Sequence, residues 1–177
     1  LLANKMFYIA TDDADVDVSD EEARQAQIQY IFLGTGRTGD DGAEIVLSKK
    51  EKKAVEKRAN KLLAEARKTD HFSELAEKKS DAAQTEIIMG GNETSLPGEV
   101  VSAAMGLKTG ELSTLIETSN GYYILYCANE KDADATYEKK EEIIAARQER
   151  MFKEKYSRWL GENEIEISKS FWKIFHV

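Results

Sequence analysis

The sequence predicts an α+β fold in which short strands alternate with helices along one chain. Three observations lead to this fold class. Four short segments have the composition and alternation of strands, a capped segment has helical periodicity, and one long charged helix follows the last strand. With 177 residues, the chain has the size of one medium domain or of a smaller domain with extensions.

The first elements come from the N-terminal 33 residues. Residues 1–8 are too apolar for a free tail, and we expect them to pack against another part of the chain. Residues 12–22 are acidic and poor in large apolar groups, so they predict a solvated linker that ends in a helix start at Ser19 or Asp20. Residues 26–33 place Ile28, Tyr30 and Phe32 on one face and Ile31 and Leu33 on the other, and they predict a strand.

The middle of the chain predicts two helices after a Gly/Asp-rich loop. Ser48 and Glu51 have the spacing of a capping box at the start of a helix that runs to residue 66. Asp70 is suited to cap a second, short helix whose apolar positions include Phe72 and Leu75. Residues 85–89 then predict an extended segment, which Gly90 interrupts.

A hairpin and a long helix complete the prediction. Residues 99–105 predict a short helix that Gly106 stops, and residues 113–117 and 122–128 predict two strands joined at Asn120-Gly121. The second of these strands is apolar on both faces and should be central. Residues 137–160 predict one helix with a broad apolar stripe, ended by Gly161. An extended 165–167 segment and an aromatic cluster (Phe171, Trp172, Phe175) follow, and the N-terminal stub is the available partner for these surfaces.

Composition excludes several function classes. The formal net charge is −8 and no basic cluster is interleaved with aromatics, which argues against a basic nucleic-acid-binding face. Cys127 is the single cysteine, so neither an intrachain disulfide nor a multi-cysteine zinc site is available. No stretch approaches the ~20 consecutive apolar residues of a membrane span. Because the chain begins at Leu1 without an initiator Met, an upstream signal, anchor or further domain stays open.

Three motif matches fail on their context. The glycines at 34, 36 and 39 follow a strand, but no helix opens at the third glycine, so they predict a loop rather than a dinucleotide site. The alternating aspartates at 13, 15 and 17 lack the glycine and glutamate that complete a calcium loop. His71 and His176, the two histidines, have no partners arranged for nucleophilic catalysis, and the sequence predicts no metal site and no cofactor.

The residues from 26 to about 129 carry a family resemblance. The block Leu107-Lys108-Thr109-Gly110-Glu111-Leu112-Ser113, followed by Glu117-Thr118 and Gly121-Tyr122-Tyr123-Ile124, resembles a parvulin-type peptidyl-prolyl cis/trans isomerase domain. Phe72-Ser73-Glu74-Leu75-Ala76 and Ser80-Asp81 support it in the right order. The resemblance implies a small, mostly antiparallel four-stranded sheet surrounded by helices.

The flanks resemble those of extracytoplasmic foldases of the PrsA and SurA kind. This likeness implies three parts: residues 1–24 as the stub and linker of a helical lobe, 25–130 as the isomerase domain, and 131–177 as a long helix and aromatic tail that complete the lobe. It also implies an exported bacterial protein, at the cell surface or secreted, with a lipid anchor left open. A homodimer through the terminal helices is a further open alternative.

The resemblance also implies site residues. The proline-pocket positions fall on Leu96, Val100 and Met105, although Val100 and Met105 fit equally well as core residues of their helix. The two family histidines fall on Tyr30 and Tyr123. The central Cys or Asp falls on Ala82, the residue before the glycine is Asn120, and Thr118 keeps the family type. As the alternative, each tyrosine is an ordinary sheet aromatic.

The function implied is isomerisation of X-Pro bonds in unfolded or proline-containing polypeptides of exported proteins. Rotation about such a bond has a barrier of ~20 kcal/mol and needs no covalent chemistry, only a pocket that favours the twisted imide. Because the polar positions are largely replaced, we expect weak activity. The alternative is a non-catalytic chaperone or peptide-binding module on the same fold.

Overall fold

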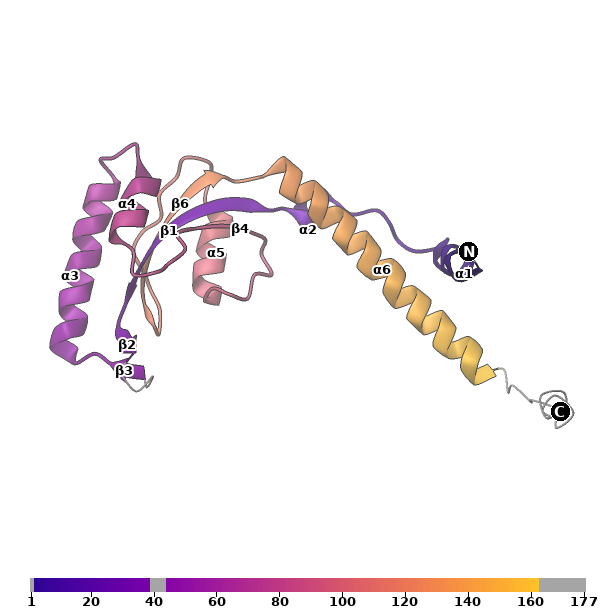
Figure 1. Cartoon of the computed structure of the whole chain (residues 1–177). Coiled ribbons are helices and arrows are strands. Elements are labelled where there is room, and N and C mark those ends of the chain that lie inside the picture. Colours follow the sequence, from indigo (N-terminus) through magenta and orange to yellow (C-terminus); the bar gives the residue numbers. More distant parts are fainter. Residues whose placement is uncertain (1, 39–43, 163–177) are drawn as a thin grey trace, which may run out of the picture. The chain divides into compact units, whose positions relative to one another are not determined.

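The computed structural model describes residues 2–38 and 44–162 of the chain (Figure 1). Two compact units are formed: Asp20–Lys139 is one, and Leu1–Ser19 with Lys140–Val177 is the other. In the part of the chain that the structure describes, no helix combines the length and apolar character needed to cross a membrane.

The larger unit contains a four-stranded sheet in the order β4-β1-β6-β5. Its strands are β1 (Ala26–Gly34), β4 (Glu86–Met89), β5 (Ile116–Glu117) and β6 (Gly121–Asn129), and every neighbouring pair is antiparallel. The predicted antiparallel four-stranded sheet is therefore confirmed. The strand predicted over 122–128 is central as expected, because its apolar side chains pack on both faces of the sheet.

Helices cover both faces of this sheet. They are α2 (Asp20–Ala23), α3 (Lys49–Ala66), α4 (Phe72–Lys79) and α5 (Gly98–Gly106). The predicted capping box is present at α3: the Glu51 backbone N–H donates to the Ser48 hydroxyl, and the Ser48 N–H donates to the Glu51 carboxylate at 2.8 Å. This reciprocal pair satisfies backbone donors that the first turn leaves free, which fixes where the helix begins.

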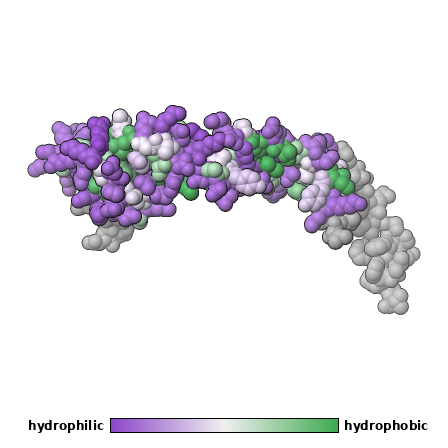
Figure 2. All heavy atoms as spheres, turned by 90° about the horizontal axis from the view of Figure 1, so that it is seen from above, coloured by the Kyte–Doolittle hydropathy of each residue, from purple (hydrophilic) through white to green (hydrophobic). Residues whose placement is uncertain are grey.

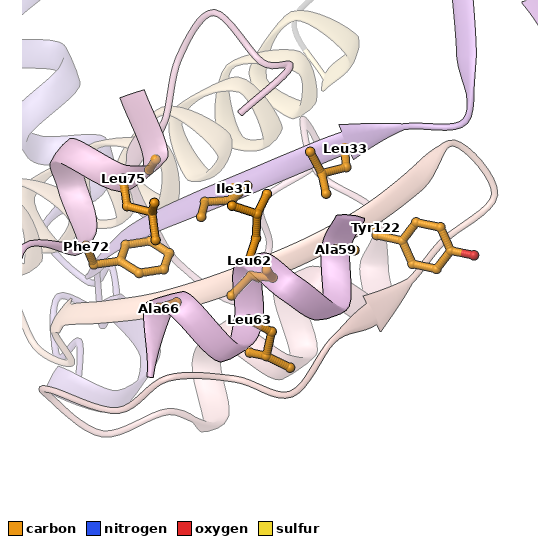
Figure 3. Close-up of a cluster of buried hydrophobic side chains, with 11 residues drawn as sticks. Ile31, Leu33, Ala59, Leu62, Leu63, Ala66, Phe72, Leu75 and Tyr122 are labelled. Atoms are coloured by element: carbon orange, nitrogen blue, oxygen red, sulfur yellow. The ribbon is translucent and has the colours of Figure 1, made fainter. Parts of the chain in front are cut away.

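One face of the sheet packs against α3 and α4 (Figure 1). Because side chains alternate along a strand, this face receives Ile31 and Leu33 from β1 and Tyr122 and Ile124 from β6. Figure 3 shows Ile31 and Leu33 of β1 among the inward side chains of the two helices. We call this cluster the α3/α4 face; its buried helix residues are Ala59, Leu62, Leu63, Ala66, Phe72, Leu75 and Ala76.

The opposite face, which we call the α5 face, uses the alternate residues of the same strands. Its buried members are Ala26, Ile28, Tyr30, Met89, Val100, Val101, Ala104, Tyr123, Leu125 and Cys127. A margin of half-buried residues surrounds them: Phe32, Ala82, Ile87, Leu96, Ala103, Met105, Leu107 and Ile116. Cys127 is fully buried and packs as a small apolar group, as expected.

Three expectations for the larger unit were wrong in detail. The loop expected after residue 33 contains an antiparallel hairpin of β2 (Gly36–Thr38) and β3 (Glu44–Val46). Asp70 does not cap the second helix, whose N-cap is His71 without a side-chain cap hydrogen bond.

The strand expected over 113–117 is regular only at β5. Upstream of β5 the Ser113 hydroxyl accepts the Leu125 N–H at 2.9 Å and donates to the Thr114 carbonyl at 2.7 Å. A side chain thus replaces part of the backbone pairing, so the ladder is interrupted.

The smaller unit joins α1 (Leu2–Thr11) to the last part of α6 (Ala133–Glu162). The ring centroids of Phe7 and Phe152 lie 5.3 Å apart, so the apolar stub does contact the long helix. The acidic segment after α1 is not a purely solvated linker as expected. Arg147 on α6 donates to the Asp15 carboxylate and to the Asp17 carbonyl, both at 3.1 Å.

The long helix was predicted too short and too buried. It begins at Ala133 and ends at Glu162, one residue beyond Gly161. Its expected apolar stripe (Tyr137, Ile144, Met151, Phe152, Tyr156, Trp159 and Leu160) is only partly covered, since Tyr137 is 64% exposed and Leu160 is 53% exposed. The extended segment 165–167, the aromatic cluster at 171–175 and His176 lie outside the described residues.

Candidate functional site

Two tyrosines on neighbouring strands lie at the centre of the α5 face. Tyr30 of β1 is 8% exposed and Tyr123 of β6 is 5% exposed. Phe32 stands directly opposite Tyr123 in the strand register, and Tyr30 lies diagonally from it. The ring centroids of Tyr30 and Tyr123 are 6.2 Å apart, and those of Phe32 and Tyr123 are 4.7 Å apart. The three rings therefore form one continuous aromatic surface.

Both phenols are neutral at physiological pH. Burial raises the pKa of Tyr30 above its ordinary value, and the neighbouring Tyr123 raises it further. Burial also raises the pKa of Tyr123, against the effect of a hydrogen bond with the Asn120 side chain, while the charge of Glu99 adds to the increase. A neutral phenol retains its O–H group, so each tyrosine remains a hydrogen-bond donor.

The predicted proline-pocket residues belong to the same face. Leu96 and Met105 are half-buried in its margin, and Val100 is fully buried beneath them. Ala82 is also half-buried in the margin, in the segment between α4 and β4. The fold thus brings together six of the eight predicted site residues in one cluster, from four segments that are distant in the sequence. Leu96 and Met105 have accessible surface to contact a ligand, whereas Val100 supports the wall from behind.

The remaining two predicted residues form the turn between β5 and β6. The Thr118 hydroxyl donates to the Asn120 side-chain carbonyl at 2.5 Å and to the Gly121 carbonyl at 2.9 Å. The backbone carbonyl of Asn120 accepts a hydrogen bond from the Thr35 N–H at 3.0 Å, which connects the turn to the residue after β1. Through its hydrogen bond with Tyr123, Asn120 connects this turn to the aromatic surface.

Gly121 permits the close contact of the two central strands. A Cβ atom at this position would lie 2.2 Å from the Leu33 carbonyl oxygen and 2.7 Å from a ring carbon of Phe32. Both distances are far below van der Waals contact. Only glycine therefore lets β6 pass close enough to β1 to place Tyr123 beside Phe32.

Sequence reasoning missed the part of the site that surrounds Phe32. The Ser80 hydroxyl accepts N–H groups from Phe32 at 3.0 Å and from Ala82 at 3.2 Å, and the Asp81 N–H donates to the Phe32 carbonyl at 2.8 Å. These bonds hold Ala82 against the margin of the α5 face. The signal available was the alternation that places Phe32 on the same strand face as Tyr30.

An open cavity of about 420 Å³ borders the site at Met105. Its other lining residues come from α2, from the link between α2 and β1, and from the loop after β4: Glu21, Glu22, Arg24, Gln25, Gly90, Gly91 and Asn92. Arg24 donates from its guanidinium to the Met105 carbonyl, which anchors the last turn of α5 beside this cavity.

The site combines an apolar surface with neutral hydrogen-bond donors. The members of the α5 cluster are apolar or aromatic, and none carries a formal charge at neutral pH. Such a surface desolvates an apolar ring, while the phenols offer hydrogen bonds without a counter-charge. This chemistry suits reactions in which no covalent bond changes and the transition state is less polar than the ground state.

Comparison with known proteins gives the family. The family model called Rotamase, a PPIC-type PPIASE domain, matches residues 36–129, just over half of the chain. A solved PpiC-type peptidyl-prolyl cis-trans isomerase domain shares 20% sequence identity at a TM-score of 0.50, over 65% of this chain and 99% of that domain. No protein of curated function matches the sequence.

Two solved foldases align over nearly the whole chain at lower structural similarity. PrsA from Bacillus subtilis is 20% identical, with a TM-score of 0.43, over 93% of this chain and 62% of that one. The foldase protein PrsA from Streptococcus pneumoniae is also 20% identical, with a TM-score of 0.46, over 98% and 60%. The chain therefore spans about three fifths of the length of these two proteins.

The matched range includes the segments that build the α5 face, apart from the whole of β1, which carries Tyr30 and Phe32. The fold of the matched part is similar to that of the solved domain. The chain belongs to the PpiC-type peptidyl-prolyl cis/trans isomerase family.

Proposed function

We propose that this protein catalyses cis/trans isomerisation of X-Pro bonds slowly, through a site in which two neutral tyrosines form the polar floor. The observation that carries the proposal is the Tyr30–Tyr123 pair, with ring centroids 6.2 Å apart, on the apolar face that also holds Leu96 and Met105. We infer the reaction from family membership and the low rate from the tyrosine pair.

The reaction requires a preference for the twisted imide. Planar X-Pro bonds gain resonance that gives the carbonyl oxygen partial negative charge, and this resonance is lost at the top of a barrier of ~20 kcal/mol. Moving the bond onto an apolar surface removes water from the polar planar form and costs the twisted form less. Each tenfold of rate requires ~1.4 kcal/mol of this preference.

The tyrosines contribute donors of moderate strength. As the imide twists, the proline nitrogen recovers a lone pair that accepts a hydrogen bond, and a phenol O–H is suited to donate one. A neutral phenol is a weaker donor than a charged group, because hydrogen bonds that involve a charged partner are roughly twice as strong. We therefore expect a smaller acceleration of isomerisation than in a site whose polar residues are charged or strongly polarised.

The proline ring is held by the margin of the α5 face. Leu96 and Met105 offer accessible apolar surface, and the Phe32 ring closes the aromatic side. Burying a proline ring against three such side chains is worth a few kcal/mol at ~25 cal/mol per Å². Val100 supports this wall without contacting the substrate.

We further propose that the substrates are unfolded segments of exported proteins and that the protein acts as an extracytoplasmic foldase, at the cell surface or secreted. Family membership and the alignment with PrsA chains along nearly the whole sequence motivate this. Export of a tagged full-length gene product, followed by cell fractionation, tests it. Recovery of the product in the cytoplasm would contradict the proposal.

The test of catalysis is NMR exchange spectroscopy on Ala-Xaa-Pro-Phe peptides, which reports isomerisation without a coupled protease. The protein should accelerate exchange, and Leu96→Ala or Met105→Ala should reduce the acceleration several-fold. Leu112→Ala is a matched control, because Leu112 is half-buried against the α3/α4 face. Line broadening without acceleration would replace the proposal with a non-catalytic binding module.

A further inference from the structure

One edge of β1 pairs with β6, and the opposite edge is covered differently at the two ends of the strand. From Phe32 onward the segment between α4 and β4 closes that side: Phe32 bonds with Ser80 and Asp81, and the Gly34 N–H donates to the Asp81 carboxylate at 3.1 Å. Arg58 of α3 donates to the same carboxylate and holds the segment in place. Before Phe32, β4 covers β1, and β4 itself is the last strand of the sheet.

The outer side of β4 has free backbone groups at two positions. Ile87 pairs with Ile28, Met89 pairs with Ala26, and the Tyr30 N–H donates to the Thr85 carbonyl at 2.8 Å. Because hydrogen bonding alternates along an antiparallel strand, the N–H and C=O groups of Glu86 and Ile88 point away from β1. Within residues 2–38 and 44–162, no hydrogen bond reaches these outward groups.

The surface beside this edge is apolar and acidic. Ile88 is 49% exposed, although it is a large β-branched residue in a strand. An open groove of about 690 Å³ runs along the edge and is lined by Glu77 of α4 and residues 83–88. Glu77 and Glu86 are the two ionisable residues of this lining, and both are acidic. The Glu86 carboxylate accepts hydrogen bonds from the side chains of Gln27 and Gln29, which hold it over the β1–β4 pair.

Most exposed sheet edges carry a lysine, a proline or a bulge that prevents further pairing. The β4 segment Glu86-Ile87-Ile88-Met89 has none of these; its short length of four residues and the Glu86 carboxylate are what protect it. In the view of Figure 2 the surface is largely hydrophilic, with hydrophobic side chains in separate patches. Ile88 is an exposed apolar anchor beside outward donors and acceptors at two positions, which favours an extended backbone as the occupant rather than a folded apolar surface.

We propose that the outer edge of β4 binds an extended polypeptide segment as a fifth strand, with a basic residue of that segment facing Glu77 and Glu86. The occupant is an unfolded polypeptide. Its identity as a client of this protein rests on the proposed function. Backbone hydrogen bonds to Glu86 and Ile88 supply the affinity, and the two carboxylates favour Lys or Arg over acidic residues. This edge binds without proline and is separate from the tyrosine site.

The test uses the full chain and a proline-free heptapeptide that alternates valine with lysine. In ¹⁵N-HSQC titrations the amide signals of Glu86 and Ile88 should shift, and their hydrogen exchange should slow at saturation. Ile88→Pro removes one outward N–H and the apolar anchor and leaves the pairing with β1 intact, because Pro is tolerated where the N–H faces solvent. We expect at least about a tenfold loss of affinity.

Charge variants give a second measure that does not depend on strand geometry. Glu77→Lys should weaken binding of the lysine peptide several-fold and remove part of its salt dependence. Glu74→Lys is the matched control on the same helix: Glu74 pairs with Lys78 and does not line the groove. A peptide with glutamate in place of lysine should bind more weakly than the lysine peptide.

Three results would overturn the proposal. They are unchanged affinity in a folded Ile88→Pro variant, shifts confined to the region of Tyr30 and Tyr123, and concentration-dependent self-association that Ile88→Pro abolishes, which would make a second copy the occupant. The isomerase assay separates this inference from the proposed function. A protein that binds the proline-free peptide but accelerates no X-Pro exchange retains the strand-addition site, and a catalyst that ignores the peptide retains the isomerase site.

Discussion

The two faces of the sheet are built from alternate residues of the same strands, yet they differ in how completely they are covered. On the α3/α4 face, two helices of 18 and 8 residues cover the strands. On the α5 face a single 9-residue helix leaves a margin of half-buried side chains around Tyr30 and Tyr123. Among the described residues, the α5 face thus has eight half-buried apolar side chains at its margin, whereas the α3/α4 face has four.

Because of this difference, we expect the α3/α4 face to contribute mainly to stability and the α5 face to contribute to ligand binding as well. A completely packed face loses dispersion contacts and leaves a cavity when a side chain is shortened. A half-buried margin loses less, because water fills the space, but it loses the surface that a ligand would contact. Substitutions of the same residue type on the two faces should therefore differ in their balance between lost stability and lost activity.

The largest expected effect compares two phenylalanines. Phe72 is 4% exposed and stacks on Tyr126 at 5.4 Å on the α3/α4 face, whereas Phe32 is half-buried and contacts Tyr123 on the α5 face. Phe72→Ala should cost about 3–5 kcal/mol of unfolding free energy and leave kcat/KM of the folded protein unchanged. Phe32→Ala should cost about half as much and reduce kcat/KM. Urea unfolding and exchange spectroscopy measure both; equal losses of stability would contradict the comparison.

The second effect concerns the strand contact on which both faces depend. Gly121→Ala places a methyl group 2.2 Å from the Leu33 carbonyl oxygen, so β1 and β6 must separate there. We expect a loss of about 2–3 kcal/mol together with reduced activity, since Tyr123 moves with the strand. Gly106→Ala is the control: nothing lies within 4 Å of the added carbon, at the end of α5. Thermal unfolding should show a lower Tm for the first variant only.

The elements that the sequence predicted correctly have local causes. The capping box at Ser48, the alternation of residues 26–33 and the Asn120-Gly121 turn each act within a few residues, so their patterns are visible without the fold. The errors have tertiary causes. Asp70 had a suitable side chain but the helix begins two residues later, and the Ser113 side chain replaces strand hydrogen bonds only because Leu125 lies opposite.

The candidate site divides in the same way. The family resemblance assigns Tyr30 and Tyr123 by position along their strands, and the antiparallel register then brings their rings together. The contribution of Phe32 depends on Ser80 and Asp81, 48 and 49 positions further along the chain. No short-range pattern reports such a contact.

The third prediction concerns substitution of the polar residues on the α5 face. The triple variant Tyr30→His, Ala82→Asp, Tyr123→His should raise turnover about tenfold, equivalent to ~1.4 kcal/mol, if the tyrosine floor limits the rate. Tyr126→His is the matched control, because Tyr126 packs on the α3/α4 face. Exchange spectroscopy measures the rates and circular dichroism the fold. No increase in a folded triple variant would mean that the face serves binding rather than catalysis.

The smallest expected effect is the pH dependence of stability. Burial raises the pKa of Tyr30 and Tyr123 above the ordinary value near 10, so at higher pH the unfolded chain loses protons before the folded chain does. The unfolded state is then favoured, and stability that is complete below about pH 10 falls as pH rises through the folded-state pKa values. Burial also raises the pKa of Tyr122 and of the Cys127 thiol, which adds to the fall from about pH 9 upward.

Variants identify the share of the α5 face in this alkaline loss. Tyr30→Phe with Tyr123→Phe removes two of the ionising groups and should reduce the loss of unfolding free energy between pH 8 and pH 11, measured by urea titration. Tyr122→Phe removes the corresponding group from the α3/α4 face. A double variant with the same slope as the parent would show that the two phenols ionise equally well folded and unfolded, and so would remove the argument that the site is a dry, neutral surface. A reduced slope would support the physical state that the proposed isomerisation requires, because neutral, desolvated phenols are what distinguish this face from an ordinary solvated sheet surface.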